Sequence, residues 1–164
     1  MSNPETPVKP MIILVAGPYR SGTGDDPARM ADNLRRLEEA ALSLFQAGHI
    51  PLIGEWLALP LMAVAGSRAV GDTVYEEIAY PVAHRLLTRC DAVLRIPGAS
   101  KGADLDVKIA TERGLAVYSR LEDVPGCAQR AACVVQFRAD SGFQRRWRKK
   151  SLSIVAASAA AMPS

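Results

Sequence analysis

Aromatic residues are scarce in this chain: Phe, Trp and Tyr make up only 5% of its 164 residues, although 49% of the residues are apolar. A core without many large rings has to be built from aliphatic side chains and alanine, which is typical of helices packed on a sheet of Val, Ile and Leu. The composition therefore favours an α/β domain. The length predicts a single domain, large enough to fold without a metal ion or a disulfide.

The sequence also lacks the patterns that mark secreted, membrane and metal-binding proteins. The chain has an odd number of cysteines, Cys90, Cys127 and Cys133, and none of them forms a CxxC pair. The N-terminal residues MSNPETPVKP lack the apolar core of a signal peptide. No uninterrupted apolar run reaches the ~18 residues of a membrane-spanning helix. His49 and His84 share no metal-ligand spacing with the cysteines or with each other. We therefore expect a soluble, cytoplasmic protein with no metal site, no cofactor and no membrane partner.

The net charge of +3 is unevenly distributed along the chain. Residues 1–126 contain 13 Lys and Arg against 16 Asp and Glu, whereas residues 127–164 contain 7 against 1. With the three prolines of residues 1–10, this shift predicts a disordered leader (1–10), an α/β domain (11–126) and a basic, Ala-rich C-terminal appendage (127–164). The appendage contains RRWRKK, in which an aromatic ring among cations suits nucleic acid or an anionic membrane; a solvated end is the alternative.

Short apolar runs alternate with helical patterns in the predicted domain. MIILVA is a continuous apolar run that ends in Gly-Pro, as expected of a central strand covered on both faces. Strands joined by helical crossovers form the βαβ units of a parallel sheet. We therefore predict a doubly wound, mostly parallel sheet with flanking helices, of the flavodoxin or Rossmann type. The predicted strands are 11–16, 49–54, 91–96 and 115–120, and the predicted helices are 28–48, 71–90 and 103–114.

Local signals add detail to these elements. Asp72 or Thr73 should cap the helix at 71–90, and Pro81 should kink it. The apolar segment EWLALPLMAVAG (55–66) is either a buried short helix or part of a subunit contact, and Pro60 should interrupt or open a helix there. The helix at 28–48 is expected to bury one apolar face, formed by Met30, Leu34, Leu37, Ala41, Leu44 and Phe45.

Two polar loops follow adjacent-looking strands: GPYRSG after the first strand and PGASKG after the third. Since ligands of doubly wound sheets bind at the carboxyl ends of strands, both loops should open onto one crevice. Arg20 and Lys101 supply positive charge, and the amides of Gly102 and Ala103 open a helix and should face an anion. A phosphate or a sugar hydroxyl would fit, whereas two plain turns are the alternative, since neither loop is a known phosphate motif. The predicted binding residues of the loops are Gly17, Pro18, Arg20, Ser21, Ser100, Lys101, Gly102 and Ala103.

Three longer stretches resemble a known superfamily. VAGPYR, NLRRLEEAALSLFQAGHIPL and RCDAVLRIPGASKGADLDVKIATERGLAVY look like the nucleoside 2-deoxyribosyltransferase-like superfamily, especially its small branch of uncharacterised domains, over roughly residues 11–120. The resemblance implies an N-glycosidic bond hydrolase or pentosyltransferase that acts on a nucleoside or nucleotide. It also implies a homodimer or higher homo-oligomer in which a neighbouring subunit completes each site, and WLALPLMAVAG would suit such a contact.

The superfamily opens a helix with an S-x-G-x-x-x-E segment whose glutamate attacks the anomeric carbon of the sugar. Ser100 and Gly102 match this segment, but the glutamate position falls on Asp106, whose carboxylate has an arm shorter by one methylene. A nucleophile misplaced by about 1 Å loses on the order of a hundredfold in rate. The resemblance also places Tyr19 beside the sugar and base. Asp91 matches a recurrent family aspartate, with a turn residue before a strand as the alternative.

The acidic residues leave several roles open. Asp106 is the predicted nucleophile and Asp104 the second candidate; because residues two apart point about 200° from each other on a helix, only one should face the crevice. Both could instead be acids that complement the dipole at a helix N-terminus. Glu55 directly follows the second strand, on the expected ligand side, and is a candidate acid or a solvated carboxylate.

Two other functions compete with the enzyme. A non-catalytic nucleotide-binding module would use the same loops, with an Asp106 that no longer reacts; the change from glutamate to aspartate favours this alternative. A nucleic-acid-associated protein would act through the basic appendage, and nucleic acid is the least expected of these partners.

Overall fold

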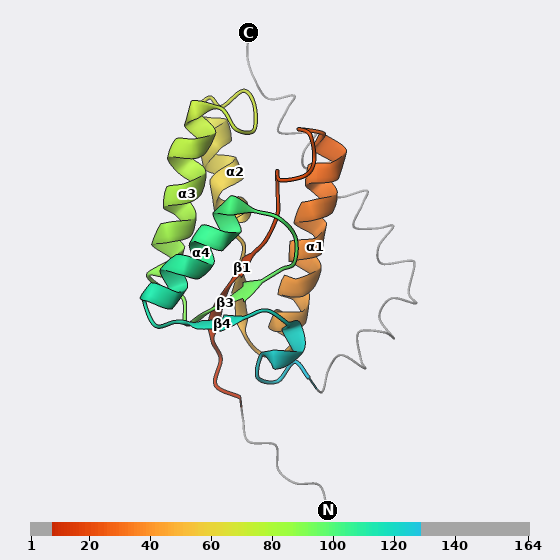
Figure 1. Cartoon of the computed structure of the whole chain (residues 1–164), viewed down its shortest axis with the longest axis vertical. Coiled ribbons are helices and arrows are strands. Elements are labelled where there is room, and N and C mark those ends of the chain that lie inside the picture. The colour runs from red at the N-terminus through yellow and green to blue at the C-terminus, as the bar shows by residue number, and fades with distance from the viewer. Residues whose placement is uncertain (1–7, 129–164) are drawn as a thin grey trace, which may run out of the picture. The chain divides into compact units, whose positions relative to one another are not determined.

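The computed structural model describes residues 8–128, shown in Figure 1. Most of the predicted leader and nearly all of the predicted appendage, including RRWRKK, lie outside the described residues. Within residues 8–128, no helix is both long enough and apolar enough to cross a membrane.

Four parallel strands form one sheet. They are β1 (Ile12–Ala16), β2 (Ile50–Leu52), β3 (Ala92–Arg95) and β4 (Ala116–Tyr118). Their order is β2-β1-β3-β4, and each pair of neighbours runs in parallel. In the central strand β1, Ile13, Leu14 and Val15 are at most 1% exposed, as the continuous apolar run predicts. The topology confirms the predicted doubly wound α/β fold.

Helices cover both faces of this sheet. They are α1 (Pro27–Gln46), α2 (Gly54–Val64), α3 (Thr73–Leu87) and α4 (Lys101–Glu112), followed by the 3-10 helix η1 (Leu121–Asp123). Figure 1 shows α1 on one side of β1, and α3 and α4 on the other. Because side chains alternate along a strand, Ile13 and Val15 pack with α1, while Leu14 and Ala16 pack with α3 and α4.

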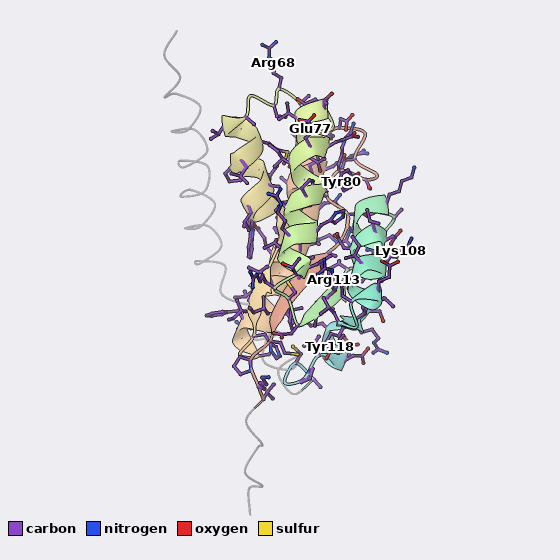
Figure 2. All side chains as sticks on the ribbon, turned by 90° about the vertical axis from the view of Figure 1, so that its left-hand side faces the viewer. Arg68, Glu77, Tyr80, Lys108, Arg113 and Tyr118 are labelled. Carbon is purple, nitrogen blue, oxygen red and sulfur yellow. The ribbon has the colours of Figure 1, made fainter. Side chains whose placement is uncertain are left out.

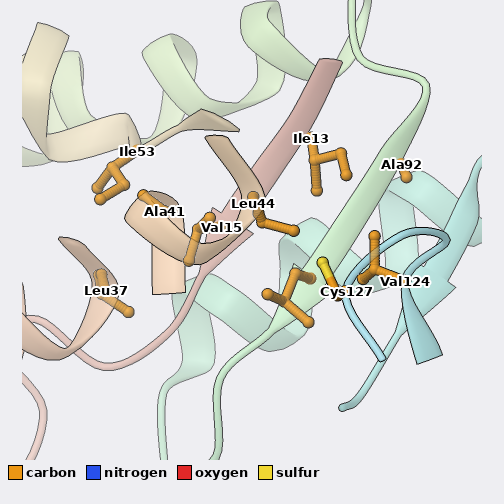
Figure 3. Close-up of a cluster of buried hydrophobic side chains, with 10 residues drawn as sticks. Ile13, Val15, Leu37, Ala41, Leu44, Ile53, Ala92, Val124 and Cys127 are labelled. Atoms are coloured by element: carbon orange, nitrogen blue, oxygen red, sulfur yellow. The ribbon is translucent and has the colours of Figure 1, made fainter. Parts of the chain in front are cut away.

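The core on the α1 side is made of aliphatic side chains, as the shortage of aromatics predicts. Figure 3 shows Leu37, Ala41 and Leu44 of α1 in this cluster, together with Val124 and Cys127 from the segment after β4. Phe45 was expected on the same face, and this prediction is wrong: its side chain is 67% exposed. Leu44 and Phe45 are consecutive and about 100° apart around the helix, so only one of them points to the sheet.

Neither internal proline ends its helix. Pro60 lies inside α2, which continues to Val64, so the prediction that Pro60 would interrupt or open a helix is wrong. Pro81 lies inside α3, which continues to Leu87. A proline removes one backbone N–H from the hydrogen-bond ladder but leaves the residues on either side free to stay helical when their side chains are packed.

Two aspartates hold the backbone at element ends. Asp72 is the N-cap of α3, and its Oδ1 accepts a hydrogen bond from the Tyr75 amide at 2.7 Å. This settles the choice between Asp72 and Thr73. Asp91 Oδ2 accepts a hydrogen bond from the Ile12 amide at 2.8 Å, which ties the start of β1 to the turn before β3. Asp91 therefore has the structural role of a turn residue before a strand, which the sequence analysis gave as the alternative.

The segment 55–66 is a helix with one buried and one exposed side. Ala58 and Met62 are buried, whereas Trp56, Leu57, Leu61 and Val64 are exposed and form what we call the outer face of α2. Leu57, Leu61 and Val64 are spaced four and three residues apart and so share one side of the helix. Trp56 Nε1 donates a hydrogen bond to Glu38 Oε1 of α1 at 3.1 Å.

Packing requires the glycine that directly follows β1. A Cβ atom on Gly17 would lie 2.6 Å from Leu37 Cδ2 and 2.9 Å from Ile96 Cβ. Leu37 is 1% exposed and the Ile96 Cβ is attached to the backbone, so neither atom can move away cheaply. At Gly54, by contrast, a Cβ would meet only Ala83 Cβ at an ordinary 3.8 Å.

We therefore expect Gly17→Ala to lower the free energy of unfolding by about 1–3 kcal/mol, the usual cost of overpacking a core. The control Gly54→Ala should leave that free energy unchanged or raise it by up to about 1 kcal/mol, because alanine restricts the unfolded chain. Urea denaturation followed by circular dichroism measures both. Equal stabilities for the two variants would show that Gly17 is not held by its neighbours.

Candidate functional site

A cavity of about 570 Å³ opens at the carboxyl end of β1. The loop after β1, the start of α2, one face of α3 and the start of α4 form its walls. The two predicted loops therefore meet in one crevice, as the rule for doubly wound sheets requires. All but two of the predicted site residues line it: Gly17, Tyr19, Arg20, Ser21, Glu55, Ser100, Lys101, Gly102, Ala103 and Asp106.

The two exceptions are Pro18 and Asp104. Pro18 is buried and packs against Gly98, where a Cβ would lie 2.8 Å from Pro18 Cγ, so it shapes the loop without reaching the cavity. The Asp104 side chain is 68% exposed, and its carboxylate pairs with Arg95 at 2.8 Å. Asp104 and Asp106 point in opposite directions from α4, so the predicted second nucleophile lies outside the cavity.

Asp106 is partly buried in the cavity wall. Loss of water raises the pKa of its carboxyl to about 7, and the negative charge of Glu55 contributes, while the Arg95 guanidinium acts in the opposite direction. A carboxylic acid that titrates near neutral pH can exchange a proton with a bound molecule. Asp104 is instead exposed and paired with Arg95, so the structure separates Asp106 from Asp104.

Glu55 lies at the first turn of α2, directly after β2. Burial raises the pKa of the Glu55 carboxyl above its ordinary value. Its charge in turn raises the pKa of Tyr19, Tyr75 and Asp106, and all three line the same cavity as Glu55. Glu55 is therefore the group that electrostatically links the wall made by α4 to the walls made by α3 and the loop after β1.

Tyrosine side chains border these carboxyls. The chain has 4 tyrosines, and Tyr19, Tyr75 and Tyr80 all line the cavity. Burial is the main cause that raises the pKa of Tyr75 to about 12, so its phenol keeps its proton at neutral pH and can donate a hydrogen bond. Tyr80 lies on the side of α3 that faces α4 (Figure 2), where its Cε1 would be 3.5 Å from a Cβ at Gly102.

Sequence reasoning missed the contribution of α3. Its lining residues are Tyr75, Glu76, Ala79, Tyr80 and Ala83, which recur at spacings of three and four and so form one helix face. A usable signal was present: in a chain with few aromatics, two tyrosines lie on one short helix.

The start of α4 offers less to an anion than the sequence suggests. Ser100 is the N-cap, and its Oγ accepts a hydrogen bond from the Ala103 amide at 3.2 Å. The prediction that both the Gly102 and Ala103 amides face a ligand is therefore wrong for Ala103, whose amide is already engaged. Lys101 is exposed at the rim, and within residues 8–128 it forms no ion pair.

Arg20 is held by its own loop. Its Nε donates to Asp25 Oδ1 at 2.6 Å and its second terminal nitrogen donates to Asp25 Oδ2 at 3.2 Å. Asp25 has a φ of +63°, a left-handed conformation that non-glycine residues seldom adopt. The guanidinium lies over the backbone of Gly71, where a Cβ would be only 1.9 Å away. Arg20 thus spans the gap between the loop after β1 and the turn before α3.

The histidines play no part in this cavity. His49 is 2% exposed; its Nδ1 accepts from the Met11 amide at 3.2 Å, and its Nε2 lies 2.7 Å from the Pro125 carbonyl oxygen. With Nδ1 as an acceptor, Nε2 carries the proton and donates. Among residues 8–128, no group of three or more His, Cys, Asp or Glu side chains is arranged to hold a metal ion.

No family model matches this sequence, and a search of curated proteins finds no significant match.

The raised pKa of Asp106 predicts a pH-dependent cost to stability. Between about pH 4 and pH 7 the folded protein keeps the Asp106 proton and the unfolded chain does not, so the free energy of unfolding falls as the pH rises. Asp106→Asn removes the titrating group and with it this pH dependence. The free energy of unfolding of the variant, relative to that of the unaltered protein, should therefore rise by roughly 2–4 kcal/mol between pH 4 and pH 7.5, measured by urea denaturation at each pH. A stability difference that does not change with pH would contradict the raised pKa.

Proposed function

We propose that this protein binds a nucleoside or nucleotide in the cavity at the end of β1 and cleaves or transfers its N-glycosidic bond. The observation that carries the proposal is the pair of carboxyls, Asp106 and Glu55, that face one cavity and interact with each other. Glycosidic chemistry requires two carboxyl groups with different protonation states on opposite sides of the bond. The resemblance of residues 11–120 to the nucleoside 2-deoxyribosyltransferase-like superfamily supports the same chemistry.

The cavity suits a ligand of this size and polarity. Its volume of about 570 Å³ lies within the range of small-molecule sites. Tyr19, Tyr75 and Tyr80 provide aromatic surface against which a base can stack, and their phenols can bond to sugar hydroxyls. Ala58 and Met62 of α2 add an apolar wall.

The pair has to share one proton for the reaction to proceed. Two neighbouring carboxyls resist ionising together, so the pair holds a single proton over a pH range that ends near the Asp106 value of about 7. In the reactive form Asp106 is the carboxylate and Glu55 the acid. Asp106 takes the role of nucleophile because the resemblance assigns the role to this position. Since the raised pKa of Asp106 keeps the shared proton on this residue in the resting protein, the proton passes to Glu55 when the reactive form is made.

The reaction then proceeds in two balanced steps. The Asp106 carboxylate forms a bond to the anomeric carbon while the bond from that carbon to the base nitrogen breaks. The bonding electrons pass to the base, which takes the proton of Glu55 and leaves. Water, or a second base in a transfer, then attacks the anomeric carbon and gives its proton to Glu55, and the Asp106 carboxylate is released.

We expect purified protein to release free base from one or more members of a panel of nucleosides and 5′-monophosphates, detected by liquid chromatography. Asp106→Asn and Glu55→Gln should each lower kcat by about 10²–10⁴-fold. The value of kcat/KM should fall as the pH rises through about 7, because above that pH the pair has lost its last proton and no acid is left.

An N7-methylated purine nucleoside separates the two roles, because its leaving base is already cationic and needs no acid. This substrate should restore most of the activity of Glu55→Gln and little of that of Asp106→Asn. If the substrate instead restored the activity of Asp106→Asn and not that of Glu55→Gln, Asp106 would be the acid and Glu55 the nucleophile. No release from any substrate, with ligands that still raise the melting temperature, would replace the enzyme with a nucleotide-binding module.

We also propose that the protein forms a homodimer through the outer face of α2. Leu61 is 53% exposed and Val64 is 90% exposed, a large apolar surface for one helix. Residues 56–66 contain no charged residue, so a second copy of the same face can cover it without burying an unpaired charge. Because Glu55, Ala58 and Met62 line the cavity from the other side of the same helix, such a contact would stabilise the cavity wall.

Leu61→Glu should therefore convert the dimer to a monomer, since it places a charge at the centre of the contact. Size-exclusion chromatography with light scattering measures the mass. The control Leu105→Glu changes a 37% exposed leucine of α4 in the same way and should leave the mass unchanged. A monomeric unaltered protein would rule out the contact.

A further inference from the structure

The charged side chains around the cavity do not favour an anion. Four carboxyl groups line it, those of Asp25, Glu55, Glu76 and Asp106, against the two cations Arg20 and Lys101. With one proton shared between Asp106 and Glu55, the lining carries three negative charges and two positive charges. The two loops alone had pointed the other way, because Arg20 and Lys101 are the charged residues that they display.

Arg20, the more obvious phosphate ligand, is already engaged. Asp25 binds it through two separate nitrogens, at 2.6 Å and 3.2 Å, in the fork geometry that an arginine would otherwise use for a phosphate. The pairing raises the pKa of Arg20 further and lowers that of Asp25, so both remain charged. The negative charge of Glu76 also acts on the guanidinium, from α3.

The remaining cations supply little compensation. Arg95 acts on Asp106, but it pairs with Asp104 and donates to the carbonyl oxygens of Ile96 and Gly98, so its donors are used within the loop before α4. Of the two cations that line the cavity, Lys101 is the one without a carboxylate partner within the described residues, and it lies at the exposed rim.

We propose that Asp25 is a specificity-determining residue, which occupies Arg20 and thereby excludes substrates that carry a phosphate. The preferred substrate is then a nucleoside with a free 5′-hydroxyl. The inference rests on the proposed function. A 5′-monophosphate carries nearly two negative charges at neutral pH, and Asp25 and Glu76, which line the cavity together with Arg20, would repel it.

The first experiment compares kcat/KM for a nucleoside and its own 5′-monophosphate in the unaltered protein. The nucleoside should be preferred by at least about tenfold at low salt. Added salt screens the repulsion, so kcat/KM for the monophosphate should rise between 20 and 300 mM NaCl, on the order of a few-fold, while that for the nucleoside stays constant. If Arg20 bound the phosphate, salt would lower the monophosphate value instead.

The second experiment releases Arg20. Asp25→Asn removes one negative charge and frees the guanidinium, so kcat/KM for the monophosphate should rise at least about tenfold relative to that for the nucleoside. The control Asp32→Asn removes an aspartate from another arginine pair, Asp32–Arg35 at 2.8 Å, which does not line the cavity, and should leave the ratio unchanged. The salt series on the unaltered protein does not depend on whether either variant folds.

Calorimetric titration of the same two ligands separates the two proposals. Cleavage with a preference for the monophosphate would overturn the role of Asp25 and leave the glycosidic function standing. Tighter binding of the nucleoside without any cleavage would overturn the function and support the exclusion of phosphate. If neither ligand binds, both proposals fail.

Discussion

Every strand of the sheet runs in the same direction, and this constraint places the rest of the molecule. A parallel sheet needs a crossover between successive strands, so the loops that follow β1, β2 and β3 all emerge at one edge. Gly17, Glu55 and Ser100 follow these three strands in turn. They are far apart in the sequence and meet at one cavity because the strands that precede them are parallel neighbours of β1.

The close packing at the end of β1 connects this arrangement to the core. Gly17 has Leu37 of α1 on one side and Ile96 of the loop after β3 on the other, at distances that leave no room for a side chain. The same residue lines the cavity. The floor of the site is therefore the upper surface of the hydrophobic core, and a change in core packing would be transmitted directly to the position of the loop after β1.

Burial gives the carboxyls of the cavity their chemical character. Asp104 and Asp106 are two residues apart on one helix, yet one is paired with Arg95 in contact with water and the other titrates near neutral pH. The difference arises from the direction of the side chain and the presence of Glu55, since low polarity and a nearby like charge both disfavour ionisation. Arg20 shows a complementary effect, because an ion pair with Asp25 already engages a residue that the sequence alone would assign to a ligand.

The sequence by itself determined the elements of this protein and their order. The continuous apolar run at 11–16 predicted a buried central strand, and the pattern at 28–48 predicted a helix with one buried face. The apolar run at 55–66 left two alternatives open, and the structure shows that it belongs to a helix. The position of each loop relative to the sheet was therefore also predictable, and so were most of the residues that line the cavity. What lay beyond the sequence was the direction and partner of each side chain: that Leu44 rather than Phe45 enters the core, that α3 contributes Tyr75, and that Arg20 is bound to Asp25. Periodicity is a property of the local backbone, whereas burial, charge pairing and proton affinity depend on neighbours that only the tertiary structure brings together.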